Sequence, residues 1–164
     1  METYKNIEGY DNYEISDLGN VRNKTTGKII KSRIDSKGYY VIDLRSCPNV
    51  KKTFSLHRLL ATAFIENLEG KPVVDHIDRN PLNNKLDNLR WATVSENGMN
   101  KKTQRNNTST CTGVRFKKDK QMWCTEIKLQ GKSKFIGHYV NLDDAVNARK
   151  EAETKYFGEF QAIK

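Results

Sequence analysis

Short stretches of hydrophobic residues, rather than long helical patterns, dominate the chain. Residues 13–21 and 28–30 place apolar side chains between turn-forming residues, and residues 38–44 and 52–56 are β-rich runs that predict a hairpin. Residues 57–64 repeat large apolar side chains at helical spacing, which predicts an amphipathic helix. We therefore expect the first third of the chain to be β-rich and to lead into one helix.

The middle of the chain has two further apolar runs separated by a polar loop. Residues 73–77 and 89–93 predict two strands, and the Asn- and Asp-rich loop between them contains Pro81. A helix should follow, with Ser95 as its N-cap. This order predicts a β-hairpin packed on a helix.

The last third predicts a different arrangement of three strands and one helix. Residues 103–112 have no apolar periodicity and are interpreted as a linker. Strands are expected at residues 113–116, 123–129 and 134–139, followed by a helix at residues 142–157 with alanines at intervals of three and four. A three-stranded sheet covered by one helix results.

Charge suggests the class of partner. The 164 residues include 29 Lys and Arg against 20 Asp and Glu, a net charge of +9, and residues 105–164 hold 12 basic and 7 acidic side chains. A polyanion, most commonly nucleic acid, is the simplest partner for this surplus. No apolar run approaches the roughly 20 residues that span a bilayer, so we expect no membrane association. Three separated cysteines without a CxxC pair favour a reducing, intracellular compartment.

One group of polar residues in the middle segment could perform chemistry. Asp75 and His76 end the first predicted strand, Asn88 precedes the second, and Asn97 lies in the following helix. A carboxylate and an amide oxygen are hard ligands suited to one Mg²⁺ or Mn²⁺ ion. His76 could accept a proton from water near neutral pH. Asn88 could orient His76 through its second ring nitrogen or bond the backbone of the loop.

Three segments resemble known families. Residues 57–97, HRLLATAFIENLEGKPVVDHIDRNPLNNKLDNLRWATVSEN, resemble the HNH (ββα-metal) nuclease motif of phage homing endonucleases. The earlier GYDNYEISDLGNVRN resembles the small module that often precedes this motif. The later GVRFKK, WCTEIKL, FIGHY and DDAVNARKEA resemble the APETALA2-type DNA-binding domain, in which a three-stranded sheet enters the major groove.

The resemblance implies an α+β fold of small modules and a role for each site residue. We expect an N-terminal β-rich module at residues 1–52, the HNH nuclease domain at 53–102, a linker at 103–112, and the APETALA2-like sheet and helix at 113–164. By resemblance, His76 is the catalytic general base, Asp75 and Asn97 are the metal ligands, and Asn88 has a structural or orienting role.

The flanking modules would then hold double-stranded DNA. By resemblance, basic positions of the C-terminal sheet contact DNA, whereas Trp123 could face either DNA or the core. His57 could touch a phosphate or cap its helix. The full set of predicted DNA-binding residues is Arg115, Lys117, Trp123, Lys128, Lys134, Arg22, Arg33, His57 and Arg58.

These features predict a site-specific, metal-dependent DNA endonuclease of the HNH homing type. One motif contains one active site, so a monomer would nick one strand, with no small-molecule cofactor. The protein would act inside a host cell and be encoded by a phage or mobile element. Two alternatives remain open: a non-catalytic DNA-binding regulator that retains the nuclease fold, and a structure-selective junction nuclease.

Overall fold

The computed structural model describes residues 1–46, 50–101, 103 and 107–161, and divides into two compact units. The first unit is Met1–Thr93 and the second is Val94–Lys164. Within the described residues, no helix is long and apolar enough to cross a membrane. The break predicted at residues 47–49 lies outside the described residues.

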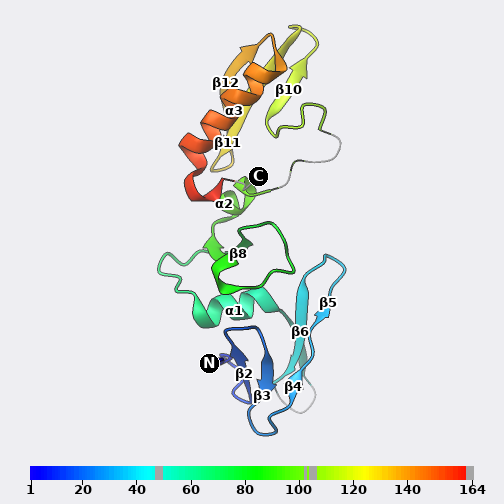
Figure 1. Ribbon diagram of the computed structural model, residues 1–164, viewed down its shortest axis with the longest axis vertical. Helices are drawn as coiled ribbons and strands as arrows, with labels where there is room; N and C mark the ends of the chain where they lie inside the picture. The colour runs from blue at the N-terminus through cyan, green and yellow to red at the C-terminus, as the bar shows by residue number, and fades with distance from the viewer. Residues whose placement is uncertain (47–49, 102, 104–106, 162–164) are drawn as a thin grey trace. The chain divides into compact units, whose positions relative to one another are not determined.

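Two small antiparallel sheets form the start of the first unit (Figure 1). Its four-stranded sheet has the order β1-β2-β3-β4, and its three-stranded sheet has the order β5-β6-β7. The strands of these two sheets are β1 (Tyr4–Asn6), β2 (Tyr13–Ser16), β3 (Val21–Asn23), β4 (Ile29–Ile30), β5 (Arg33–Ile34), β6 (Tyr40–Arg45) and β7 (Lys51–Ser55).

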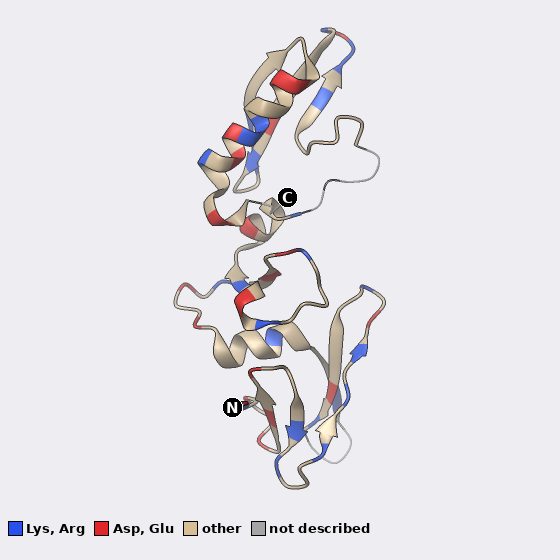
Figure 2. Cartoon of the chain, in the orientation of Figure 1, with Lys and Arg blue, Asp and Glu red and all other residues tan. Residues whose placement is uncertain are grey.

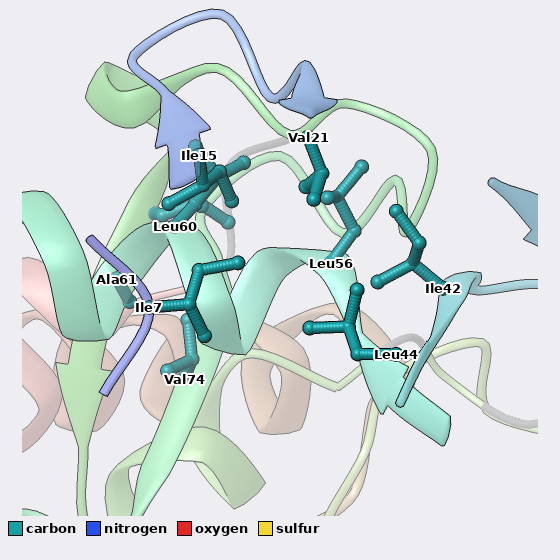
Figure 3. Packing of buried hydrophobic residues seen from close by; sticks show 10 residues of the cluster. Ile7, Ile15, Val21, Ile42, Leu44, Leu56, Leu60, Ala61 and Val74 are labelled. Atoms are coloured by element: carbon teal, nitrogen blue, oxygen red, sulfur yellow. The ribbon is translucent and has the colours of Figure 1, made fainter. Parts of the chain in front are cut away.

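Helix α1 (Leu56–Phe64) follows β7 directly and organises the core of the first unit. Its side chains Leu56 and Leu60 lie one turn apart, and both are buried, as an amphipathic helix requires. They pack in one cluster with Ile15 of β2, Leu44 of β6 and Val74 of the later hairpin (Figure 3). The helix therefore joins both sheets and the hairpin in one hydrophobic core.

This shared core differs from the predicted division at residues 52 and 53. The expected N-terminal module and the nuclease hairpin belong to one unit, because α1 buries apolar side chains against both. The predicted end of the nuclease domain at residue 102 also differs, since the second unit begins at Val94. Helix α2 (Val94–Met99) thus belongs to the second unit rather than to the hairpin's unit.

The predicted hairpin in the middle of the chain is present. Strand β8 (Val73–His76) pairs antiparallel with β9 (Leu89–Ala92), and a short 3-10 helix, η1 (Leu86–Asn88), leads into β9. Register places Asp75 opposite Arg90 and His76 opposite Leu89. The loop of residues 77–85 therefore begins directly after the two predicted site residues of β8.

The second unit contains the three strands and the helix expected in the last third. Strands β10 (Val114–Lys117), β11 (Met122–Leu129) and β12 (Lys132–Tyr139) form an antiparallel sheet in that order. Helix α3 (Leu142–Phe157) packs on this sheet and ends in η2 (Gly158–Phe160) (Figure 1). Ile127 of β11 is fully buried against Ala152 and Phe157 of the helix.

The described part of the predicted linker is ordered by side-chain hydrogen bonds. Ser109 is fully buried, and its hydroxyl oxygen lies 2.9 and 2.7 Å from the carbonyl oxygens of Cys111 and Val114, within hydrogen-bonding distance of both. The amide nitrogen of Asn107 donates to the Cys111 carbonyl at 3.1 Å. Because these bonds are made by Ser and Asn side chains rather than by apolar periodicity, the hydrophobic pattern predicted a linker where a packed turn exists.

Candidate functional site

Asp75 is held by a buried ion pair across the hairpin. Arg90 donates from Nε and Nη2 to Oδ2 of Asp75, at 3.0 and 2.8 Å. The Asp75 and Arg90 side chains are only 7% and 14% exposed. Sequence reasoning did not single out Arg90, although opposite charges at facing register positions are the signal that would have identified it. The pair fixes the position of the carboxylate that was predicted to bind metal.

The imidazole of His76 is oriented by a residue from the loop. Its Nε2 lies 2.9 Å from Oδ1 of Asn84. An amide oxygen only accepts hydrogen bonds, so Nε2 carries the proton of the neutral ring and Nδ1 carries the lone pair. This is the tautomer that a general base needs if Nδ1 is the atom that accepts a proton. Asn84 was not among the predicted site residues.

Asn88 organises the loop between the two strands. Its Oδ1 accepts from the Asp78 backbone N–H at 3.0 Å, and its Nδ2 donates to Asp78 Oδ1 and the Asn83 carbonyl at 2.9 and 2.8 Å. Burial opposes ionisation of Asp78, but hydrogen bonds from Asn83, Asn80 and Asn88 outweigh it and lower its pKa. Of the two roles considered for Asn88, this geometry matches bonding of the loop, while Asn84 contacts the imidazole.

Two more rings surround His76. His57 of α1 has its ring centroid 4.9 Å from that of His76, and Tyr39 lies 5.3 Å from His57 and 6.0 Å from His76. His57 is 9% exposed and His76 is 6% exposed. Arg58, the neighbour of His57, donates from Nη2 to the Pro72 carbonyl just before β8. These contacts attach α1 to the hairpin at the site.

Asn97 lies in a different unit from the other three predicted chemical residues. It is half-buried in α2, which belongs to the second unit, whereas Asp75, His76 and Asn88 belong to the first. Its predicted pairing with Asp75 around a metal ion stays a prediction. Among the described residues, no group of three or more His, Cys, Asp and Glu side chains could hold a metal ion.

Known proteins resemble both the site and the segment before it. A family profile described as HNH endonuclease matches residues 55–99, and one described as the NUMOD4 motif matches residues 2–45. The DNA endonuclease I-HmuI of Bacillus phage SP01 is 42% identical over 95 residues, which are 57% of this chain and 54% of that protein. An uncharacterised HNH endonuclease of Acanthamoeba polyphaga mimivirus is 47% identical over 94 residues, 57% of this chain and 28% of that protein.

A solved structure agrees with these relatives. The structure described as DNA binding and cleavage by the HNH homing endonuclease I-HmuI superposes with a TM-score of 0.51 at 42% identity, covering 56% of this chain and 52% of that one. Residues 55–99 of this chain are thus similar to the HNH endonuclease family. The chain spans between about a quarter and just over half of the length of the curated HNH relatives described here, at 28% and 54%.

The HNH profile includes all four predicted chemical residues and the two neighbours that the structure adds. Asp75, His76, Asn88 and Asn97 lie within residues 55–99, as do Asn84 and Arg90. Neither family profile extends into the C-terminal sheet, since the matched residues end at 99. The resemblance of residues 113–164 to the APETALA2 domain therefore stays a prediction.

The predicted DNA-binding residues of the C-terminal sheet lie on two opposite faces. Thr125 donates from Oγ1 to the Ala145 carbonyl of α3 at 3.2 Å, so its face of β11 is turned toward the helix. By strand alternation, Trp123 shares this face, and it is half-buried in edge contact with Phe116. Lys134 also points to the helix side, since its Nζ lies 2.7 Å from the Tyr156 hydroxyl.

The other face of this sheet carries the remaining basic candidates. Arg115, Lys117 and Lys128 occupy the alternate positions of β10 and β11, with Phe135 of β12 exposed on the same face. Arg115 forms an ion pair with Glu126, with Nη1 2.5 Å from Oε1. Part of β10 is coloured blue, for basic residues, in Figure 2. Elsewhere in the chain, basic and acidic positions are mixed. We call Arg115, Lys117, Lys128 and Phe135 the open face.

The two N-terminal arginines among the predicted DNA-binding residues, Arg22 and Arg33, are engaged in ion pairs. Arg22 donates from Nε to Glu14 at 2.5 Å and lies over the Tyr4 ring. Arg33 is more exposed and lies 3.6 Å from Asp43.

Asp43 is bonded across the β6–β7 pair. Thr53 donates from Oγ1 to Oδ1 at 2.6 Å, and Lys51 Nζ lies 2.9 Å from Oδ2. These hydrogen bonds lower the pKa of Asp43 to about 2. The carboxylate is therefore charged at neutral pH and ties the two strands together.

Proposed function

We propose that this chain is a site-specific, metal-dependent DNA endonuclease of the HNH homing type that nicks one strand. The observation that supports this most directly is the oriented pair at the end of β8. Arg90 fixes Asp75, and Asn84 fixes His76 in the tautomer whose Nδ1 can take a proton. The match of residues 55–99 to the HNH endonuclease profile supports it further, because relatives with this motif include a DNA endonuclease.

The proposed reaction is hydrolysis of a phosphodiester. His76 Nδ1 takes a proton from water as the water oxygen bonds to phosphorus, and the bond from phosphorus to the 3′-oxygen breaks. The leaving oxygen takes a proton from solvent, so the products are a 3′-hydroxyl and a 5′-phosphate. Proton transfer of this kind contributes about 10² to 10⁴ in rate.

A divalent cation fits the donor atoms available to this chain. Asp75 and Asn97 would hold it through a carboxylate and an amide oxygen, which suit Mg²⁺ or Mn²⁺ better than zinc. When bound, such an ion supplies Lewis-acid stabilisation of the charge that develops on the phosphate and the leaving oxygen. Arg90 already compensates part of the Asp75 charge, so its role is to position the carboxylate rather than to replace the ion.

The open face of the C-terminal sheet is the proposed DNA-binding surface of the second unit. Arg115, Lys117 and Lys128 present cations there, and α3 covers the opposite face. Arginine can read guanine through two hydrogen bonds, whereas lysines mainly contact phosphates. The resemblance to an APETALA2-like domain also implied Lys134 and left Trp123 open; because both lie on the helix side of the sheet, we leave them out of this proposed surface. A monomer with one active site would nick a single strand.

The test is cleavage of supercoiled plasmids that carry a randomised insert. With Mg²⁺ or Mn²⁺, we expect open circles, and sequencing their ends should give one target. His76→Ala should lower the nicking rate at least about 100-fold, whereas the control Glu8→Ala, at an exposed residue in the turn after β1, should nick like the parent. Nicking by His76→Ala at the parent rate contradicts the assignment. Plasmid that is bound but stays supercoiled indicates a non-catalytic regulator instead.

Metal binding is tested separately by titrating Mn²⁺ into the protein and recording its paramagnetic resonance signal. Asp75→Ala and Asn97→Ala should each weaken Mn²⁺ binding, because each removes one of the proposed oxygen ligands. Asp87→Ala is the control, since Asp87 is a nearby carboxylate in η1 that has no proposed contact with the ion. Unchanged Mn²⁺ affinity in both ligand variants would refute the ligand assignment.

A further inference from the structure

His57 is the buried histidine of the first unit that the proposed reaction does not use. Its side chain comes from the first turn of α1 and lies against the ring of His76, with centroids 4.9 Å apart and planes inclined at 56°. Tyr39, just before β6, closes the group at 5.3 Å from His57. Three rings from three separate elements therefore meet at the proposed general base.

The surroundings of His57 do not suit a phosphate contact. Its residue is 9% exposed, and its Nδ1 is buried without a hydrogen-bond partner. Burial, with smaller effects of the charges on His76 and Arg58, lowers the pKa of His57 to about 4. A neutral imidazole offers no positive charge to a DNA phosphate, and an unsatisfied buried nitrogen is a cost that a purely apolar side chain would avoid.

We propose that His57 is a positioning residue for the general base, resting on the function proposed above. Its ring and that of Tyr39 form a wall against the His76 imidazole, while Asn84 fixes Nε2 from the loop. A ring held by a hydrogen bond at one atom can still rotate about that bond. The wall removes this freedom, so Nδ1 keeps one direction toward the attacking water.

This role explains why the position carries a flat, neutral side chain. A planar ring makes a tilted edge-to-face contact with its neighbour, here with the planes inclined at 56°, which a branched aliphatic side chain cannot reproduce. A neutral ring also adds no second positive charge beside an imidazole that must become protonated during the reaction. Orientation matters strongly, because a misplacement of about 1 Å at a reacting group can cost about 10²-fold in rate.

The test compares His57→Phe, which keeps a flat neutral ring, with His57→Leu, which does not. For nicking of the target DNA, His57→Leu should lower kcat about tenfold with KM unchanged, and His57→Phe should recover most of that loss. Thermal unfolding of each variant controls for the fold, and Tyr39→Leu provides a second variant if His57→Leu does not fold. A raised KM with unchanged kcat in both variants would identify a DNA contact and overturn the proposal.

A spectroscopic measurement separates this proposal from the proposed function. The chain has only three histidines, so nitrogen-15 labelling of histidine gives assignable ring signals, with His138 of the second unit as the internal reference. All three proteins should show His76 protonated at Nε2, because Asn84 sets the tautomer. The parent and His57→Phe should give sharp His76 ring signals, whereas His57→Leu should broaden them as the ring samples more than one orientation. Unchanged His76 signals in His57→Leu would overturn the positioning role, even if the parent protein nicks DNA. The same measurement decides the positioning role if the parent protein does not nick DNA.

Discussion

Replacing Gly113 with alanine should destabilise the second unit far more than the same change at Gly131. Both glycines have left-handed backbone angles, φ of +82° and +81°. A Cβ at Gly113 would lie 2.3 Å from the Glu126 backbone oxygen, whereas a Cβ at Gly131 would meet nothing within 4 Å. The pair therefore separates backbone strain from a steric clash at nearly identical φ.

The magnitude follows from the contacts. An alanine in the left-handed region costs about 1 kcal/mol at either position. At Gly113 the clash also displaces the Glu126 carbonyl, which accepts from Arg149 Nη1 at 2.9 Å. A hydrogen bond to a charged group contributes about 1.5–3 kcal/mol, so the total is about 2.5–4 kcal/mol. In a unit of this size that lowers Tm by about 12–20 °C, against about 5 °C for Gly131→Ala.

The two tryptophans allow the measurement to be made on each unit. Trp91 lies in the first unit and Trp123 in the second, so their indole N–H resonances report the two units separately during heating. We expect the Trp123 signal to be lost early in Gly113→Ala and the Trp91 signal to follow the parent. Equal shifts in the two alanine variants would refute the steric argument. Unfolding of the second unit also removes the open face. The DNA affinity of Gly113→Ala should therefore fall at the temperatures where the Trp123 signal reports unfolding.

Three further outcomes are expected. Asn84→Ala should lower the nicking kcat about tenfold with little change in KM, because His76 loses its tautomer-fixing acceptor; an unchanged kcat would contradict that role. Because the pKa of Asp43 is lowered to about 2, its contribution to stability is complete above about pH 4 and is lost as pH falls toward 2. The free energy of unfolding measured against pH should lack this pH-dependent contribution in Asp43→Asn. Arg115→Ala should reduce the slope of log affinity against log salt by about 0.9, whereas Lys134→Ala, on the helix side, should leave it unchanged.

Local patterns were sufficient to predict the elements that carry the site. The apolar spacing of residues 57–64 predicted α1, and the alternation around Val74 and Trp91 predicted the β8–β9 pair. These elements form because one strand face and one helix stripe must be buried, which is visible in the order of residue types. The residue types at Asp75 and His76 then indicated the chemistry.

The same sequence patterns did not predict the contacts between secondary-structure elements. The pairing of Asp75 with Arg90 depends on hairpin register, and the contact of His57 with His76 depends on how α1 packs against β8. Helix spacing placed Leu60 in a core but did not show that this core also contains Ile15 and Leu44. The two segments on either side of residues 52 and 53 share this core, which the order of residue types along the chain does not reveal.

The distribution of charge indicates that DNA affinity and cleavage depend on different parts of the chain. Asp75 is paired with Arg90, and His57 is neutral, so these three neighbours of His76 contribute little net positive charge for holding a phosphate. The net charge of +9 is instead concentrated toward residues 105–164, whose open face presents Arg115 and Lys128. Affinity for DNA should therefore depend on the second unit and on salt, whereas the rate of cleavage should depend on the orientation of His76. Variants of the open face should change Kd with kcat preserved, and variants around His76 should do the reverse.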